Sequence, residues 1–252
     1  MVGGFGPQQT VRIAAVGFLA TILAGMALRT RRGGAPAPVA TAAPAPVEAG
    51  WRLRDDRLLW SSAWGLTCVL AAMSAVNVVL VFFIIRSLGS TERVYGIVDS
   101  MWTVGVLIGA WAFSRAVRPA TADATIARRV FGALGVLALA VLLIGTVPGA
   151  LWIVPIYLVG GAQNGGLNVL VGTLMGRRVP APARGRAAAA LAMRVQAGAM
   201  TGYLAGGLLL EVASPRAIVL GCGALGLATV LAVLPFVLRA ATPRDLGLQI
   251  AR

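Results

Sequence analysis

Long apolar runs alternate with short polar segments along the chain. Seven of these runs approach the roughly 20 residues that a helix needs to cross the hydrocarbon core of a bilayer. They cover about residues 13–28, 59–85, 94–113, 130–147, 151–175, 187–210 and 217–238. Backbone groups in lipid must be hydrogen-bonded within their own segment, so each run is predicted to form an α-helix. The pattern therefore predicts an all-α fold, a polytopic membrane bundle of seven transmembrane helices.

The polar segments divide the chain into four parts. The predicted parts are a single transmembrane helix (1–29), a cytoplasmic Ala/Pro/Arg-rich linker (30–57), a six-helix bundle (58–238) and a cytoplasmic tail (239–252). Arg12 is the one charged side chain before the first apolar run, and Arg29, Arg31 and Arg32 follow the run. These following arginines favour a retained helix over a cleaved signal peptide.

Composition and charge agree with a membrane location. Charged residues make up 12% of the chain, against about 25% in an average soluble domain. The net charge is +14, and all 22 basic residues are arginines. The loops on the linker's side hold seventeen of them, whereas the opposite loops hold only Arg12, Arg86, Arg93 and Arg216. The positive-inside rule then predicts a protein of the inner (plasma) membrane, with its N-terminus outside and its linker and C-terminus in the cytoplasm.

Several other classes of function lack the residues that they need. No basic face with interleaved aromatic residues is present, so we expect no nucleic-acid partner. The chain has no histidine, and Cys68 and Cys222 lie inside apolar runs without metal-ligand spacing. No P-loop, G-x-S-x-G or H-E-x-x-H motif occurs. We therefore expect no enzymatic activity, no cofactor and no metal site.

Two stretches carry recognisable motifs. One reads VPAPARGR at residues 179–186, and a helix with regularly spaced glycines follows it. The other is the apolar stretch 95–110, which is followed by Arg115. In order and spacing these stretches resemble the major facilitator superfamily, and within it the drug and siderophore exporters similar to the enterobactin exporter.

The resemblance implies roles for two groups of residues. The loop-motif group, expected in cytoplasmic loops after the eighth and tenth helices of the family, comprises Arg115, Pro180, Arg184, Gly185 and Arg186. The helix-packing group, whose spacing favours close contact between helices, comprises Gly105, Gly109, Gly198, Gly202 and Gly206.

The resemblance also matches the seven predicted helices to helices six to twelve of the family. The first helix would be the sixth, and the linker would be the central cytoplasmic loop. The chain would then be the C-terminal half of a twelve-helix carrier. Its expected partners are the lipid bilayer, a small-molecule substrate, and either a missing N-terminal half or another membrane chain.

Two charged residues lie inside predicted helices, where charge is costly and often functional. Asp99 is either a proton- or cation-coupling carboxylate or a residue close enough to the outer surface to stay hydrated. Arg194 shares a helix face with Gly198 and Gly202, so it faces protein or a water-filled cavity. It would bind an anionic group there, or extend its guanidinium toward the inner headgroups. Their depths in the membrane argue against a direct salt bridge between them.

Uncharged amides form the remaining candidates for a substrate path. Asn164 and Asn168 are four residues apart and share a helix face, and Gln163 is predicted near the bilayer centre. Asn77 is a similar, isolated candidate in an earlier helix. These amides either line a cavity or hydrogen-bond helices to one another.

The resulting prediction is secondary active transport, with efflux as the favoured direction, of a small molecule by alternating access. The incomplete cavity predicts that this chain does not transport alone. The alternative function is a non-transporting membrane scaffold or assembly partner.

Overall fold

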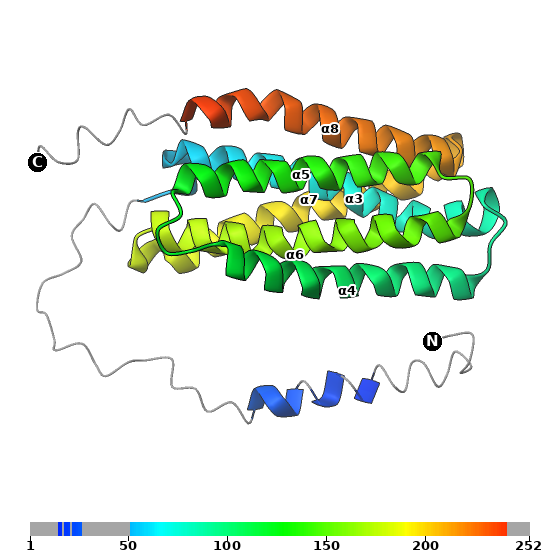
Figure 1. Cartoon of the computed structure of the whole chain (residues 1–252), viewed down its shortest axis with the longest axis horizontal. Coiled ribbons are helices and arrows are strands. Elements are labelled where there is room, and N and C mark those ends of the chain that lie inside the picture. The colour runs from blue at the N-terminus through cyan, green and yellow to red at the C-terminus, as the bar shows by residue number, and fades with distance from the viewer. Residues whose placement is uncertain (1–14, 17, 21, 27–50, 241–252) are drawn as a thin grey trace, which may run out of the picture.

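The computed structural model describes residues 51–240, together with helical residues 15–16, 18–20 and 22–26 near the N-terminus (Figure 1). The remainder of the first predicted helix, most of the linker and the tail after residue 240 lie outside the described residues. The described part is helical and contains no β-strand, which confirms the predicted all-α class.

Six long α-helices follow one another along the described chain. They are α3 (Arg57–Phe82), α4 (Glu92–Ala116), α5 (Asp123–Thr146), α6 (Ile153–Arg178), α7 (Arg184–Val212) and α8 (Pro215–Ala240). Short helical turns join them: η1 (Leu53–Asp55), η2 (Phe83–Ser87), η3 (Ala150–Trp152) and η4 (Ala181–Ala183). The helices extend a few residues beyond most of the apolar runs because their polar ends continue the same backbone hydrogen bonding.

Four of the described helices are long and apolar enough to count as membrane spans by composition alone. These candidate spans are Arg57–Ser87, Glu92–Ala116, Asp123–Thr146 and Pro215–Pro235. Helices α6 and α7, with 26 and 29 residues, are as long but carry amides, glycines and arginines within them. Their membrane crossing stays a prediction, supported by their parallel placement in the same bundle (Figure 1).

The helix contacts follow a repeated pattern. Helix α4 packs against α6, and α3 packs against α7 in the corresponding way. Helix α5 contacts α6 as α3 contacts α8, and α5 and α8 contact each other. The pattern relates α3–α5 to α6–α8 as two three-helix repeats that begin at opposite ends of the bundle. Such inverted repeats are common in secondary transporters.

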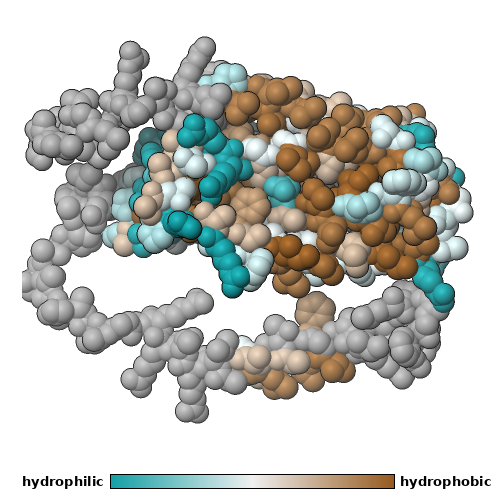
Figure 2. All heavy atoms as spheres, viewed as in Figure 1, coloured by the Kyte–Doolittle hydropathy of each residue, from teal (hydrophilic) through white to brown (hydrophobic). Residues whose placement is uncertain are grey.

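Burial separates core helices from flanking helices. Buried side chains are concentrated in α3, α5 and α6, including Leu80, Ile126, Leu134, Leu170 and Leu174. Helices α4 and α7 have only three buried residues each. Their outward faces carry large exposed apolar side chains, which suits contact with lipid or with another helical surface. Figure 2 shows apolar side chains along the flanks and hydrophilic ones at the ends.

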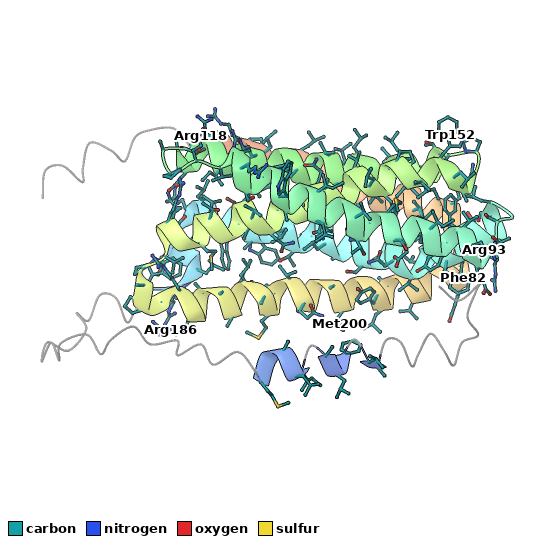
Figure 3. The ribbon with its side chains drawn as sticks, turned by 60° about the horizontal axis from the view of Figure 1, so that its bottom comes forward. Phe82, Arg93, Arg118, Trp152, Arg186 and Met200 are labelled. Atoms are coloured by element: carbon teal, nitrogen blue, oxygen red, sulfur yellow. The ribbon has the colours of Figure 1, made fainter. Side chains whose placement is uncertain are left out.

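The two ends of the bundle carry the polar loops. Figure 3 places Arg118 and Arg186 at one end, and Phe82, Arg93 and Trp152 at the other. We call the end with Arg118 and Arg186 the arginine-rich end. It contains the start of α3, the α4–α5 loop and the α6–α7 connection.

Candidate functional site

A cavity of about 500 Å³ lies between α3, α6 and α7. This volume falls within the ~300–1,000 Å³ range of pockets that hold small molecules. Its walls are mostly apolar, and the lining residues are Leu66, Leu70, Asn164, Leu167, Asn168, Val171, Gly172, Met175, Gly176, Arg184, Ala188, Leu191, Ala192 and Val195. The lining includes the last turns of α6 and the first residue of α7, so the cavity reaches the arginine-rich end. From Arg184 to Val195, α7 rises ~16 Å at 1.5 Å per residue.

Three polar side chains face this apolar space. Asn164 and Asn168 lie one turn apart on α6, and Arg184 stands where α7 begins. The Asn168 Nδ2 donates to the Asn164 carbonyl at 3.0 Å, which leaves its Oδ1 available. The Arg184 Nε donates to the Val179 carbonyl at 3.1 Å. The site therefore offers amide groups about midway along α6 and a guanidinium at its mouth.

The other two predicted amides lie outside this cavity. Asn77 is exposed on α3, and it lies eleven residues after Leu66, which is close to three full helical turns. It therefore continues the cavity-facing side of α3 toward the opposite end of the bundle. Gln163 is partly exposed and does not line the cavity.

Glycines on both helices bring α4 and α6 together. A Cβ at Gly105 would overlap the Leu158 carbonyl, and a Cβ at Gly109 would overlap the backbone of Ala162. Gly161 and Gly165 of α6 stand in the same relation to the backbone of Trp102 and Val106. The α4–α6 contact is thus a backbone-to-backbone approach that a side chain on either helix would prevent.

Glycines on α7 alone bring it against α3. Gly198, Gly202 and Gly206 lie against Thr67, Ala71 and Ala75, respectively. Arg194 lies one helical turn before Gly198, toward the arginine-rich end, and it interrupts this row of small residues.

Arg194 stacks on tryptophans instead of lining the cavity. Its guanidinium carbon is 4.0 Å from the centre of the Trp60 ring and 5.7 Å from that of Trp64. The two rings meet edge to face, with centroids 6.0 Å apart. The large Arg194 side chain of α7 therefore lies against α3, beside residues that line the cavity.

Asp99 is exposed on α4 and forms no salt bridge among the described residues. It does not line the cavity. Tyr95, one turn earlier, and Tyr157 on α6 lie near enough to its carboxylate for an electrostatic interaction. The buried Tyr157 hydroxyl has no hydrogen-bond partner in the described part of the chain.

Ion pairs join three segments at the arginine-rich end. Arg178, the last residue of α6, donates from Nε to the Asp56 carboxylate at 2.7 Å and lies 3.4 Å from Asp123. Burial disfavours the Arg178 charge, but the two carboxylates outweigh burial and raise its pKa above the usual range. Asp56 also caps α3 by accepting from the Leu58 and Leu59 amides, each at 3.0 Å. One side chain therefore links the start of α3 to the end of α6.

Arg177 extends these contacts to the α4–α5 loop. Its guanidinium lies 3.5 Å from Asp123 and donates to the Arg118 and Pro119 carbonyls at 3.0 and 3.2 Å. It also donates to the Thr121 carbonyl. The sequence did not identify these ion pairs, which join Arg177 and Arg178 to Asp56 and Asp123. The partners lie more than 50 residues apart in the chain, so no local pattern indicates the pairing, and the sequence shows only that the segment is charged.

The remaining loop-motif residues lie at the same end. Arg115 stacks on Trp111, 4.2 Å from the ring centre. Pro180 precedes η4, where the chain turns from α6 into α7. Gly185 and Arg186 occupy the exposed first turn of α7.

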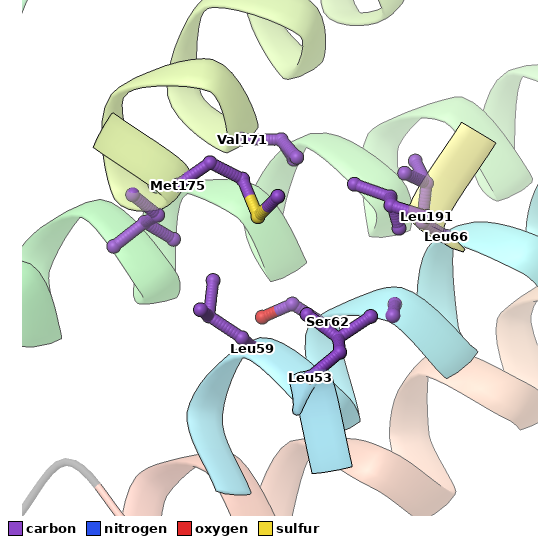
Figure 4. Close-up of a pocket in the computed structure, with 9 residues that line it drawn as sticks. Leu53, Leu59, Ser62, Leu66, Val171, Met175 and Leu191 are labelled. Atoms are coloured by element: carbon purple, nitrogen blue, oxygen red, sulfur yellow. The ribbon is translucent and has the colours of Figure 1, made fainter. Parts of the chain in front are cut away.

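A small gap lies beside the main cavity, behind Leu66, Val171, Met175 and Leu191 (Figure 4). The Ser62 hydroxyl points into it and has no partner among the described residues. The gap has a volume of about 10 Å³, near the lower limit for one water, and a buried water needs two to four polar partners. Ser62 supplies only one, so we treat the gap as a packing defect.

The fold and the cavity together define a class of protein. Inverted three-helix repeats and a mostly apolar cavity that reaches one polar end of the bundle are typical of membrane carriers. The sequence profile of the Major Facilitator Superfamily matches residues 65–251. The chain belongs to this superfamily, a group of membrane transporters of small molecules. No match was found among curated proteins or solved structures.

Proposed function

We propose that the cavity between α3, α6 and α7 is one half of a small-molecule path that works by alternating access. The observation that carries this proposal is the placement of Asn164, Asn168 and Arg184 in one apolar cavity. Two consecutive helices, α6 and α7, and the distant helix α3 contribute to it, and it extends to about the middle of α6. Its mouth lies at the arginine-rich end, which the positive-inside rule places in the cytoplasm. Importers and exporters both have a state that is open to the cytoplasm, so the proposed efflux direction rests on the resemblance to drug and siderophore exporters.

The second half of the path would come from another six-helix bundle. The exposed apolar faces of α4 and α7 flank the open side of the cavity and present large side chains, such as Leu107, Met200 and Leu204. In this superfamily the two halves rock against each other around a central site. The partner bundle would cover the α4 and α7 faces and close the cavity.

Asp99 and Arg194 take different parts in this proposal. The exposed carboxylate of Asp99 on α4 would face the partner bundle and carry a coupling proton or cation. Arg194, held by Trp60 and Trp64, would keep α7 apart from α3 and would not touch substrate. Asp99→Asn should then reduce gradient-driven transport, whereas Arg194→Lys should preserve it.

Filling the cavity tests the transport proposal. In cells that naturally make the chain, Ala188→Trp would place an indole inside the cavity, and Ala224→Trp would place one on the exposed face of α8, away from the cavity. We expect the accumulation of at least one compound in a radiolabelled panel to respond to the gene in the wild type and in Ala224→Trp. The response should be lost in Ala188→Trp.

Two outcomes would contradict parts of the proposal. If accumulation of every compound is the same with and without the gene, transport is wrong and the scaffold role takes its place. If the purified chain alone, reconstituted into vesicles, gives saturable gradient-driven flux as a monomer, the requirement for a second bundle is wrong.

A further inference from the structure

Every carboxylate at the arginine-rich end of the described chain already has a partner. Asp55 accepts from the Arg52 backbone amide at 2.9 Å. Asp56 caps α3 and pairs with Arg178, and Asp123 pairs with Arg177 and Arg178. None of the three lines the cavity. Arginines far outnumber these three acids at this end, so the net charge near the mouth is positive.

The cavity itself has the same bias. Its lining contains one charged residue, Arg184, and no acid. Among the described residues, the Arg184 guanidinium makes a single hydrogen bond, from Nε to the Val179 carbonyl. Its two terminal amino groups are left to donate into the cavity mouth. The paired arrangement of these groups suits a carboxylate or phosphate, which accepts two parallel hydrogen bonds.

The remainder of the lining fits a different kind of group. Beyond Arg184, the walls on α3 and α7 are aliphatic, with Leu66, Leu70, Leu191 and Val195. Across from them, Asn164 and Asn168 offer amide donors and acceptors one helical turn apart. A ligand that fills this space has a charged end at the mouth, an apolar body, and room for one polar group beside the amides.

Resting on the proposed function, we propose that the transported substrate is an amphiphilic organic anion. Its anionic head binds the terminal amino groups of Arg184, and its apolar body lies between α3 and α7. A lipophilic cation is disfavoured, because the described lining offers no carboxylate to offset the loss of its hydration. Topology alone explains the other arginines at this end, since cytoplasmic loops of membrane proteins are rich in them. Arg184 differs because its side chain lines the cavity.

A matched pair of fluorescent probes tests the charge preference. Dansylaminoundecanoic acid and dansylaminoundecylamine share a dansyl group and an alkyl chain, and they differ in the sign of the terminal charge. Binding to the full chain is followed by dansyl fluorescence in phosphatidylcholine nanodiscs, with empty nanodiscs subtracted. We expect the acid to bind about tenfold more tightly than the amine, as one charge-assisted hydrogen-bonded pair would give.

Two arginine variants locate the source of the preference. Arg184→Gln should reduce the ratio of affinities to about twofold or less, and Arg184→Lys should retain only part of it, because the charge remains but the paired hydrogen bonds are lost. Arg128→Gln is the matched control. It removes one positive charge at the same end, where Arg128 bonds only to Thr125 among the described residues and does not line the cavity. The ratio should survive Arg128→Gln unchanged.

The possible results separate this inference from the transport proposal. Equal binding of acid and amine to the wild type, or an equal fall in the ratio for Arg128→Gln and Arg184→Gln, overturns the anion site. Neither result affects the accumulation assay with Ala188→Trp and Ala224→Trp. Conversely, suppose that the gene has no effect on accumulation while the chain still binds the dansyl acid more tightly than the amine. That pair of results would show an anion-binding site and would contradict its role in transport.

Discussion

Two equivalent helix pairs join the repeats, α4 with α6 and α7 with α3, and they differ in how they pack. Helix α4 meets α6 with glycines on both helices, and the backbones approach closely at those glycines. Helix α7 meets α3 with glycines on α7 only, and the contact is close from Gly198 to Gly206. One turn before Gly198, Arg194 stacks on Trp60 of α3, and neighbouring residues of both helices line the cavity. The α4–α6 pair is thus packed through glycines of both helices, whereas the α7–α3 pair is packed through glycines of one helix and also forms part of the cavity wall.

The largest effect is expected at the α4–α6 pair. Gly109→Leu would place a side chain into the Ala162 backbone, which cannot move aside as a side-chain end can. We expect a loss of about 3 kcal/mol or more in unfolding free energy, at the upper end of overpacking effects. Unfolding of the purified chain by SDS in mixed micelles measures this loss. Gly207→Leu is the control, because no atom lies near the Cβ position of Gly207, and an equal loss there would disprove the close contact.

The next largest effect is expected at the ion pair that links the start of α3 to the end of α6, near the mouth of the cavity. Asp56→Ala removes both the α3 cap and the partner of Arg178. We expect it to cost about 1–2 kcal/mol, since a lost cap costs ~1 and a partly exposed ion pair adds less than 1. Asp56→Asn keeps the cap and should cost about half as much in the same unfolding assay. Equal costs for the two variants would show that the ion pair contributes nothing.

A smaller effect on stability, with a clear effect on access, is expected at Arg194. Replacing it with alanine continues the row of small residues without the poor helix propensity of glycine, and should let α7 close on α3. Loss of the stacking on Trp60 should cost about 1 kcal/mol. The cavity would narrow, so a cysteine at Gly172, in a chain lacking Cys68 and Cys222, should react more slowly with a maleimide. Arg194→Lys should keep the reaction rate, and an unchanged rate in the alanine variant would refute the spacer role.

The smallest effect is expected from alanine at Gly198. Its added Cβ would lie 2.7 Å from the Thr67 Cγ2 and 3.1 Å from the Thr67 carbonyl oxygen, so Thr67 must shift by a few tenths of an ångström. The strain is offset by the better helix propensity of alanine, worth ~1 kcal/mol, so we expect a net change within about 0.5 kcal/mol. Gly109→Ala gains the same propensity but meets backbone, and it should be clearly destabilising. If both variants behave alike in the unfolding assay, the difference between the two helix pairs is not set by these glycines.

The sequence predicted some of the site residues and could not predict others. Asn164 and Asn168 were found because amides one turn apart in an apolar helix are unusual. Their partner Arg184 was assigned only to a loop motif, because nothing local shows that the first residue of α7 faces α6. Arg194 was placed correctly on the glycine face of its helix. Its tryptophan partners were not foreseen, since Trp60 and Trp64 are more than 120 residues away in the chain.

The apolar runs alone determined the all-α class and the approximate bounds of the six described helices. The reason is that segments of this length and hydropathy have only one way to satisfy their backbone in lipid. The motif spacing indicated the superfamily, to which the profile match at residues 65–251 assigns the chain. Tertiary structure alone decided which glycines meet backbone and which helices part. These depend on distances between segments, and burial and charge at the cavity follow from them.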